Sequence, residues 1–236
     1  DNGANIIDFN LGCPVRKVTT GYGGSALMRD TDLVKRLLGS ILNSCDIPVT
    51  LKCRLGWDEN SMSAGQIIRD AAALGVSLIS IHARTRCQFF KGKANWKSVS
   101  KLKKQCKVPL IINGDITDDK SAKKALKDSE CDGIMIGRGL MGRPWLIDDL
   151  AKSVFHVELD NEKKDNIIEI FIEHIESIYN FYGLEMGNLR ARKHINWYLK
   201  NFLVPSEVKR EMLTCVTFSS LNKLLKQLKE FPILSV

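Results

Sequence analysis

The chain has 236 residues, 44% of them hydrophobic, and 35 lysines and arginines against 27 aspartates and glutamates give it a formal net charge of +8. This composition excludes intrinsic disorder, because disordered chains are poorer in apolar residues. It also excludes a membrane-spanning helix, because no run reaches the ~18 apolar residues that a span needs. The seven cysteines are too few and too scattered for a disulfide scaffold and are typical of the reduced thiols of a cytoplasmic protein.

The first residues, Asp1 to Ala4, contain neither an initiator Met nor a signal peptide. A strand-like run follows almost at once, so we expect a fragment or a processed form of a longer protein. Charge is unevenly distributed, with a basic segment at 1–150, an acidic one at 151–186 and a second basic one at 187–236. This pattern predicts a surface that binds a polyanion, and the alternative is an ordinary solvated helix surface.

Short apolar runs alternate with helical patterns along the first part of the chain, which is typical of a parallel sheet covered on both faces. The predicted strands are Ile6–Asn10, Val49–Arg54, Leu78–Ala83, Leu110–Asn113 and Gly133–Ile136. The predicted helices between them are Thr31–Cys45, Ala64–Leu74, Trp96–Cys106 and Asp118–Asp128. Asp30 and Asp118 are suitable N-caps.

The strand pattern stops after Trp145. The predicted helices of the remaining chain are Asn166–Tyr182, Asn188–Phe202, Glu207–Cys215 and Ser219–Lys229. We place a domain boundary within Asp148–Val157 and therefore predict two domains, residues 1–150 and 151–236.

Polar residues occur at the C-terminal end of almost every predicted strand, where a TIM barrel carries its chemistry. A doubly wound sheet is the alternative α/β fold. Because a closed barrel needs eight strands, we predict that the chain holds the last five strands of a (β/α)8 barrel and that three βα units precede them. We expect such a chain alone to be a weak enzyme that retains its cofactor poorly, because two sheet edges would be open.

Cys13 follows the first predicted strand and precedes Arg16 and Lys17. A loop thiol beside two cations can act as an acid, and the alternative is an ordinary loop cysteine. Lys52 and Arg54 alternate along the second strand and so point the same way. Buried cations need a partner, which we expect to be an electron-rich ligand such as a reduced flavin or, alternatively, two carboxylates.

His82 ends the third strand level with Lys52 and is a candidate ligand-facing histidine, although a lone histidine is more often structural. The glycine-containing segments Asn113-Gly114-Asp115 and Gly137-Arg138 follow the last two strands. Glycines there let backbone N–H groups approach a phosphate, and a phosphate site after the last two strands recurs in TIM barrels. Together they predict a phosphorylated cofactor. No metal site is indicated.

The segment Leu189–Lys200 predicts a helix with Ala191, Ile195 and Tyr198 or Leu199 on one apolar stripe. Cations and aromatic residues are interleaved along the rest of the helix. Such a face suits nucleic-acid phosphates and bases, and the alternative is an amphipathic surface helix.

Taken together, these motifs resemble those of tRNA-dihydrouridine synthases, and the resemblance covers nearly the whole chain. The matching segments are Asp8–Pro14, Lys52–Trp57, His82–Arg86, Asn113–Ile116, Ile136–Arg138, Gly142–Trp145, Arg192–His194 and Trp197–Tyr198. Thr85-Arg86-Cys87-Gln88-Phe89-Phe90 is most similar to the bacterial B-type branch.

The resemblance implies an FMN-binding TIM barrel, a helical tRNA-binding domain and reduction of uridine by NADPH. It implies that Cys13 is the acid that protonates the uracil ring and that Asn10 lies near flavin and base. The implied FMN contacts are Lys52, His82, Asn113, Gly114, Asp115, Gly137 and Arg138. The expected tRNA contacts are Asn10, Arg16, Lys17, Arg84, Arg86, Arg190, Arg192, Lys193 and His194. We expect a monomer in the cytoplasm without a protein partner.

Two other functions are compatible with these residues. An FMN barrel enzyme that reduces a small pyrimidine would explain the phosphate segments but not the basic helical tail. An RNA-binding fragment without flavin would explain the small number of strands. A flavin absorption band excludes the second, and tRNA binding tests the first.

Overall fold

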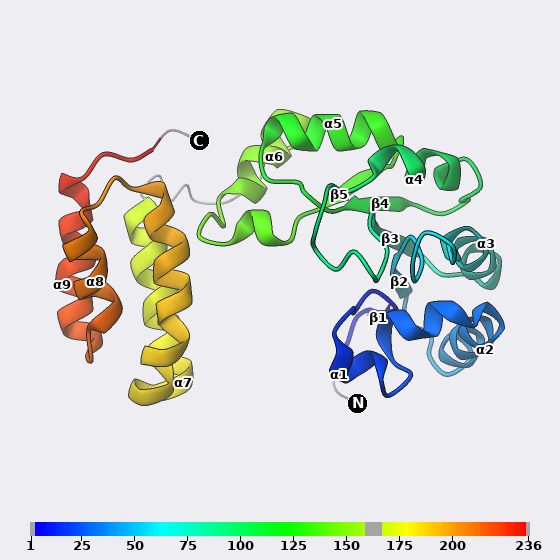
Figure 1. Cartoon of the computed structure of the whole chain (residues 1–236), viewed down its shortest axis with the longest axis horizontal. Helices are drawn as coiled ribbons and strands as arrows, with labels where there is room; N and C mark the ends of the chain where they lie inside the picture. The colour runs from blue at the N-terminus through cyan, green and yellow to red at the C-terminus, as the bar shows by residue number, and fades with distance from the viewer. Residues whose placement is uncertain (1–2, 159–166, 235–236) are drawn as a thin grey trace. The chain divides into compact units, whose positions relative to one another are not determined.

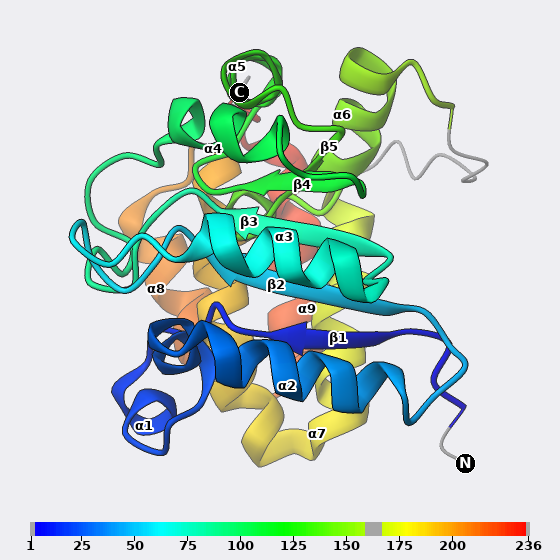
Figure 2. The same ribbon diagram turned by 90° about the vertical axis from the view of Figure 1, so that its right-hand side faces the viewer.

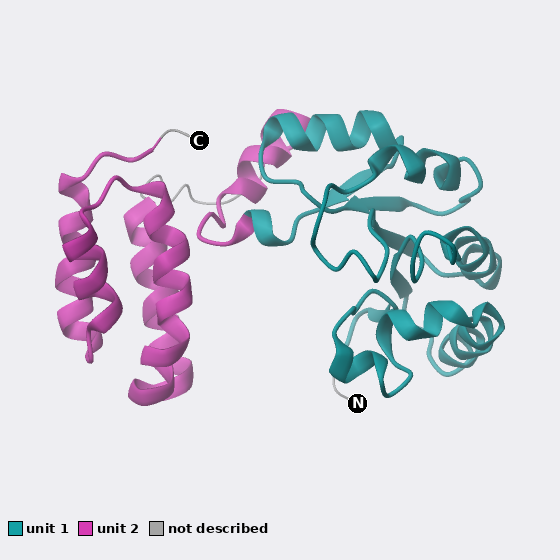
Figure 3. Ribbon diagram, in the orientation of Figure 1, with its two compact units in different colours: residues 1–139 teal, residues 140–236 magenta. Residues whose placement is uncertain are grey.

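A computed structural model describes residues 3–158 and 167–234 of the chain. These residues form two compact units, Asp1–Gly139 and Leu140–Val236, which are considered separately (Figure 3). The division falls after Gly139 rather than after residue 150.

The first unit is built on a five-stranded parallel sheet whose strands follow one another in chain order. The strands are β1 (Ile7–Asn10), β2 (Val49–Arg54), β3 (Leu78–His82), β4 (Leu110–Asn113) and β5 (Gly133–Met135). Helices α2 (Thr31–Leu42), α3 (Ala64–Leu74), α4 (Trp96–Lys103) and α5 (Asp119–Ser129) connect successive strands. Asp30 and Asp118 cap α2 and α5 as predicted, each accepting a hydrogen bond from the backbone of the first turn.

The strand order distinguishes between the two α/β folds. A doubly wound sheet reverses its strand order at a switch point, whereas this sheet runs β1-β2-β3-β4-β5 without reversal. Right-handed crossovers in a constant direction leave every connecting helix on the same side of the sheet, and Figures 1 and 2 show α2, α3, α4 and α5 following that side. The order therefore lacks the reversal of a doubly wound sheet and is compatible with consecutive strands of a barrel.

The core of this unit lies between the sheet and these helices. Leu51, Ile79, Ile81, Leu110 and Ile112 of the central strands are fully buried. The register aligns Arg54 with His82 and His82 with Asn113, so the C-terminal ends of β2, β3 and β4 form one polar row.

Two short helices precede α2 and were not predicted, because they are too short to show a hydrophobic period. They are α1 (Arg16–Thr19) and the 3₁₀ helix η1 (Gly24–Arg29). A third, the 3₁₀ helix η2 (Arg138–Leu140), follows β5.

The second unit is helical among its described residues. Its helices are α6 (Leu146–Phe155), α7 (Ile167–Tyr198), α8 (Ser206–Thr214) and α9 (Phe218–Gln227), with the 3₁₀ turns η3 (Leu199–Asn201) and η4 (Leu228–Glu230). Helix α7 turns back at Gly183, whose φ of 73° interrupts the helix (Figure 1). It thus contains most of both predicted helices, but the second ends at Tyr198 and continues as η3 rather than as α-helix to Phe202. Asn166 lies outside the described residues.

Helix α6 covers Leu146–Phe155 and so lies across the predicted boundary segment. Leu146 and Leu150 are buried one turn apart, and Lys152 pairs with Asp148 at 2.8 Å along the helix. Asp148 and Asp149 lie in the first turn, where the helix dipole favours negative charge.

The segment before α6 belongs to the helical unit. Gly142 lies against the backbone of Trp197, where a Cβ atom would clash, and its carbonyl accepts a hydrogen bond from Asn201 Nδ2 at 2.8 Å. The predicted apolar stripe is confirmed, since Ala191, Ile195 and Tyr198 are buried. Tyr198 stacks on Phe171 with ring centroids 4.2 Å apart, which joins the two halves of α7.

Candidate active site

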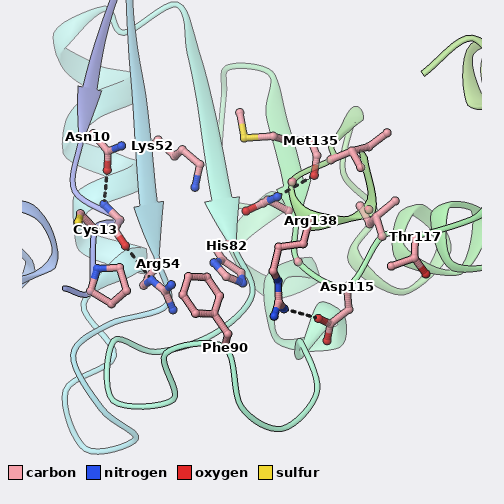
Figure 4. Close-up of a pocket in the computed structure, with 18 residues that line it drawn as sticks. Asn10, Cys13, Lys52, Arg54, His82, Phe90, Asp115, Thr117, Met135 and Arg138 are labelled. Atoms are coloured by element: carbon pink, nitrogen blue, oxygen red, sulfur yellow. Dashed lines mark hydrogen bonds and ion pairs between the residues drawn. The ribbon is translucent and has the colours of Figure 1, made fainter. Parts of the chain in front are cut away.

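A cavity lies at the C-terminal ends of the strands of the first unit (Figure 4). Its volume of ≈ 620 Å³ is within the usual range for a small-molecule site. The predicted residues that line it are Asn10, Cys13, Lys52, His82, Asn113, Gly114, Asp115, Gly137 and Arg138. Arg16, Lys17, Arg84 and Arg86 do not line it, and Arg190, Arg192, Lys193 and His194 belong to the second unit.

The loop that carries Cys13 is held by hydrogen bonds to Asn10 and Ser25. Asn10 Oδ1 accepts a hydrogen bond from the N–H of Gly12 at 2.8 Å, and the carbonyl of Cys13 accepts two from Ser25, from the N–H at 3.0 Å and Oγ at 2.8 Å. Gly24 has a φ of +54°, and a Cβ there would lie 2.7 Å from that carbonyl. Cys13 is half-buried at the wall of the cavity (Figure 4).

The contrast with Cys53 supports a special role for Cys13. Cys53 is fully buried in β2, and burial raises the pKa of its thiol to about 12. Such a thiol stays protonated and does not face the cavity. Arg16 and Lys17 are exposed on α1, so the structure does not place them on the cavity wall beside Cys13.

Arg54 is a buried cation that is held by backbone carbonyls. Its guanidinium donates hydrogen bonds to the carbonyls of Gly12 at 2.8 Å, Thr85 at 3.0 Å and Phe89 at 2.8 Å. Burial lowers the pKa of Arg54 to about 10. Backbone carbonyls thus hold Nε and Nη1 of Arg54, which also lines the cavity, and Arg54 ties the loops after β1 and β3 to the end of β2.

Lys52 is the available cation of the cavity. Its side chain extends into the cavity in Figure 4, and the structure records no ion pair for it among the described residues. Burial lowers its pKa. A desolvated ammonium without an anionic partner favours an electron-rich ligand.

His82 is a neutral hydrogen-bonding group. It is 7% exposed, and burial together with the charges of Arg54, Lys52 and Arg84 lowers its pKa to about 3. Arg84 Nη1 lies 3.3 Å from His82 Nε2, which therefore accepts, so the ring proton is on Nδ1. Gly114, at a φ of +116°, packs directly on this ring, where a Cβ would lie 2.8 Å from Cδ2.

Arg84 corrects the sequence interpretation. It is 1% exposed, and its guanidinium donates to Asp115 Oδ2 at 2.6 Å and to the carbonyls of Lys91 and Gly92 at 3.1 and 2.7 Å. A guanidinium that is buried and held by these acceptors is poorly placed to contact a tRNA phosphate, so the proposed tRNA contacts below do not include Arg84. In the sequence, an arginine at a strand end looks the same whether it is a buried structural residue or a contact for tRNA.

Asp115 links Arg84 to the rim of the cavity. It also accepts a hydrogen bond from the N–H of Ala94 at 2.8 Å, and Arg138 Nη2 lies 3.6 Å from its other oxygen. Burial alone would raise the pKa of Asp115, but these hydrogen bonds and the two arginine charges lower it overall. Asp115 thus acts as an anionic anchor that holds Arg138 over the cavity.

Phe90 is a cavity residue that the sequence did not single out as a site residue. The guanidinium carbons of Arg138 and Arg54 lie 4.9 and 5.4 Å from its ring centroid, and the His82 ring is 6.2 Å away. Its position directly after the arginine-rich strand end is the only signal in the sequence. Met135 was also missed, and its carbonyl accepts from Asn113 Nδ2 at 2.7 Å.

The lining fits a phosphorylated, planar cofactor such as FMN. Gly137 opens into free space, since a Cβ there would have no atom within 4 Å, which leaves a cradle for a group approaching the backbone. Arg138 is half-exposed beside this cradle, and Lys52 supplies a second cation. Among the described residues, no cluster of three or more His, Cys, Asp or Glu could hold a metal ion.

Comparison with known proteins agrees with this site. The sequence model of the dihydrouridine synthase family (Dus) matches residues 1–231. The chain belongs to the dihydrouridine synthase family. None of the helices in its described part is long and apolar enough to cross a membrane.

Individual relatives place this dihydrouridine synthase family member close to the B-type branch. A "Probable tRNA-dihydrouridine synthase" of Rhizobium leguminosarum bv. phaseoli is 46% identical over 86% of this chain and 62% of that protein. "tRNA-dihydrouridine synthase B" of Pasteurella multocida is 40% identical over 91% of this chain and 65% of that protein. The chain thus spans less than two thirds of the length of these relatives. A mandelate oxidase structure aligns with 96% of this chain and 71% of its own at 15% identity, with a TM-score of 0.33.

Proposed function

We propose that this protein is a tRNA-dihydrouridine synthase that reduces uridine in tRNA to 5,6-dihydrouridine, with FMN in the cavity and NADPH as the reductant. The observation that carries the proposal is the cavity itself: a half-buried thiol, Cys13, shares its wall with the unpaired cation Lys52 and the open cradle at Gly137. Family membership and the relatives' names support the same reaction.

We further propose that the five strands are part of a (β/α)8 barrel. The constant strand order and the placement of the cavity at the C-terminal strand ends support it.

The residues proposed to hold FMN act in three ways. Lys52 would face the electron-rich part of the ring, and His82 would donate from Nδ1. The remaining proposed contacts follow β4 and β5 and would hold the ribityl chain and phosphate, with Asp115 positioning Arg138: Asn113, Gly114, Asp115, Gly137 and Arg138.

The chemistry that FMN supplies when bound is hydride transfer to C6 of uracil, with NADPH as the source of the hydride. Cys13 Sγ would deliver the proton to C5, and Asn10 would lie beside the base. Addition of hydride and proton saturates the C5–C6 bond. A base must leave its stack to reach the cavity, so contacts with the rest of the tRNA must stabilise the extruded state.

The proposed tRNA contacts are solvent-accessible cations of the two units. In the first unit they are Arg16, Lys17 and the half-buried Arg86, and in the second Arg190, Arg192 and Lys193. His194 is a weaker candidate as a cation, because burial and the neighbouring His174 and Lys193 lower its pKa. The proposed substrate is consistent with a cytoplasmic, monomeric enzyme.

The decisive experiment incubates the protein with FMN, NADPH and an unmodified tRNA transcript and measures dihydrouridine. We expect a flavin absorption band near ~450 nm in the loaded protein and dihydrouridine in the tRNA. Reduction of free uracil or uridine at the same rate as tRNA would favour the small-pyrimidine alternative. Binding of tRNA without any flavin band would favour a non-catalytic RNA-binding protein.

A further inference from the structure

One cluster of cations in the first unit is not used by the cavity. It consists of Arg29 at the end of η1, Trp57 after β2, and Arg86 and Phe89 after β3, and we refer to it as the arginine–tryptophan cluster. The guanidinium carbons of Arg86 and Arg29 lie 4.5 and 5.0 Å from the centroid of the same indole ring. Phe89 contacts Arg86 as well, at 4.9 Å.

Backbone hydrogen bonds and a tight turn hold the residues of the cluster in place. Two backbone hydrogen bonds of 2.9 Å, from Arg86 to the carbonyl of Gly56 and from Cys87 to that of Trp57, join the loops after β2 and β3. Gly56 allows no side chain, because a Cβ would clash with the carbonyl of Ser61, so the Trp57 loop folds back tightly. Trp57 and Arg86 are thereby held side by side.

The charges of this cluster are not neutralised by acidic side chains of the described residues. Within the described part of the chain, no carboxylate forms an ion pair with Arg29 or Arg86. The neighbouring acids are otherwise occupied, since Asp30 caps α2 and Asp58 accepts from the N–H of Asn60. Arg86 Nε is buried without a hydrogen-bond partner, and Nη2 makes only a long contact of 3.4 Å to Thr19 Oγ1.

The cluster shares its supporting elements with the wall of the cavity. Ser25 of η1, the element that ends at Arg29, holds the carbonyl of Cys13. Phe89 precedes the cavity residue Phe90, and its carbonyl accepts from Arg54. A nucleotide chain that inserts one base beside Cys13 would therefore pass its adjacent phosphates along this cluster.

We propose that Arg29 and Arg86, stacked on Trp57, form a binding site for the phosphodiester backbone of RNA next to the inserted base. A phosphate would supply acceptors for the unpaired guanidinium groups and neutralise two charges that the protein leaves uncompensated. Stacking on the indole pre-orders both side chains, which lowers the entropy cost of binding. The inference rests on the proposed function and adds to it a subsite that includes Arg29 and Trp57.

The test measures binding of a uridine-containing pentanucleotide and of an unmodified tRNA transcript to the FMN-loaded chain over a series of salt concentrations. The variants are Arg29→Ala, Arg86→Ala and the double substitution. Arg36→Ala is the matched control, because Arg36 is exposed like Arg29 and without a recorded ion pair, but lies on α2. We expect each single cluster variant to lower the salt slope by about 0.7 on a single strand, and the double variant by about twice that. Each should raise the dissociation constant by about tenfold or more.

Arg86→Lys and Trp57→Leu separate binding from packing. Arg86→Lys keeps the charge, so the salt slope should equal that of the parent, whereas the affinity should stay below that of the parent. Trp57→Leu keeps both cations but removes the ring that orders them, so the affinity should fall with little change in slope. Flavin content should stay equal in all variants.

Two outcomes would overturn the proposal, and they differ. If the parent binds RNA and both arginine variants behave like Arg36→Ala, the cluster is not a phosphate site although the proposed function stands. If the parent binds neither the pentanucleotide nor the tRNA transcript, the proposed function fails, and this inference fails with it.

Discussion

The cavity of the first unit and the basic stretch of α7 in the second unit use cations in opposite ways. In the cavity region, Arg54 and Arg84 are almost fully buried and held by carbonyls and a carboxylate. On α7, Arg192 and Lys193 are exposed, and Lys193 Nζ lies 5.8 Å from the centroid of the Trp197 ring.

This difference shows what each region can recognise. Buried, hydrogen-bonded cations are fixed in position and set the shape and potential of a small-ligand site, with little sensitivity to salt. Exposed cations on flexible stems add to the affinity for a polyanion through counterion release, without defining a geometry. The same residue types therefore predict different chemistry depending on burial.

The largest effect is expected at the cavity wall. Cys13→Ala should lower dihydrouridine formation by about 10²–10⁴-fold, because loss of a general acid has that size, while FMN binding stays unchanged. Cys87→Ala is the control, since Cys87 is exposed and does not line the cavity. Activity of Cys13→Ala within a few-fold of the parent would remove it from the acid role.

The next test compares one arginine from each region. Arg84→Ala should lower the free energy of unfolding by about 3–5 kcal/mol, because it leaves Asp115 without its buried partner, and should also weaken FMN binding through His82 and Arg138. Arg192→Ala should change the free energy of unfolding by no more than about 0.5 kcal/mol. Denaturant unfolding of the two variants measures both values, and equal decreases would contradict the comparison.

The pH dependence of stability tests whether His82 is neutral in the folded protein. Its pKa of about 3 in the folded state lies below the ordinary value of 6.5, so between these values the unfolded chain binds a proton that the folded chain does not. Stability from this residue is therefore complete above pH 6.5 and lost as the pH falls toward 3, by about 1.4 kcal/mol per pH unit at most. His82→Gln should flatten this part of the profile, whereas an unchanged slope from pH 6.5 to 4 would show that His82 already ionises.

The smallest effect is expected on α7. The double substitution of Arg192 and Lys193 by Ala should reduce the salt slope of tRNA binding by roughly 0.9 for each phosphate that the variant no longer neutralises. NADPH oxidation without tRNA should not change, because neither residue lines the cavity. A fall in flavin reduction with an unchanged salt slope would show that these residues act on the flavin rather than on tRNA.

Much of the local structure was predictable because it depends on neighbouring residues. The strand Val49–Arg54 and the helix Ala64–Leu74 have the predicted bounds, and both predicted N-caps are present. Helix α6 was missed because it lies across the segment where the domain boundary was placed, and α1 and η1 because they are too short to show a hydrophobic period. The cavity residues at the strand ends were predicted as a group, since parallel strands bring their C-terminal ends to one edge.

The sequence by itself determined the α/β pattern, the family and the presence of cations at the strand ends, because periodicity and motif spacing are properties of the chain. Only the tertiary structure decided which cations are available to a ligand. Arg54 and Arg84 are satisfied by carbonyls and by Asp115, residues that lie up to 42 positions away in the chain, whereas Lys52, Arg29 and Arg86 form no ion pair within the described ranges. Burial and hydrogen bonding depend on such distant neighbours, so identical arginines become a structural tie at one position and a candidate phosphate ligand at another.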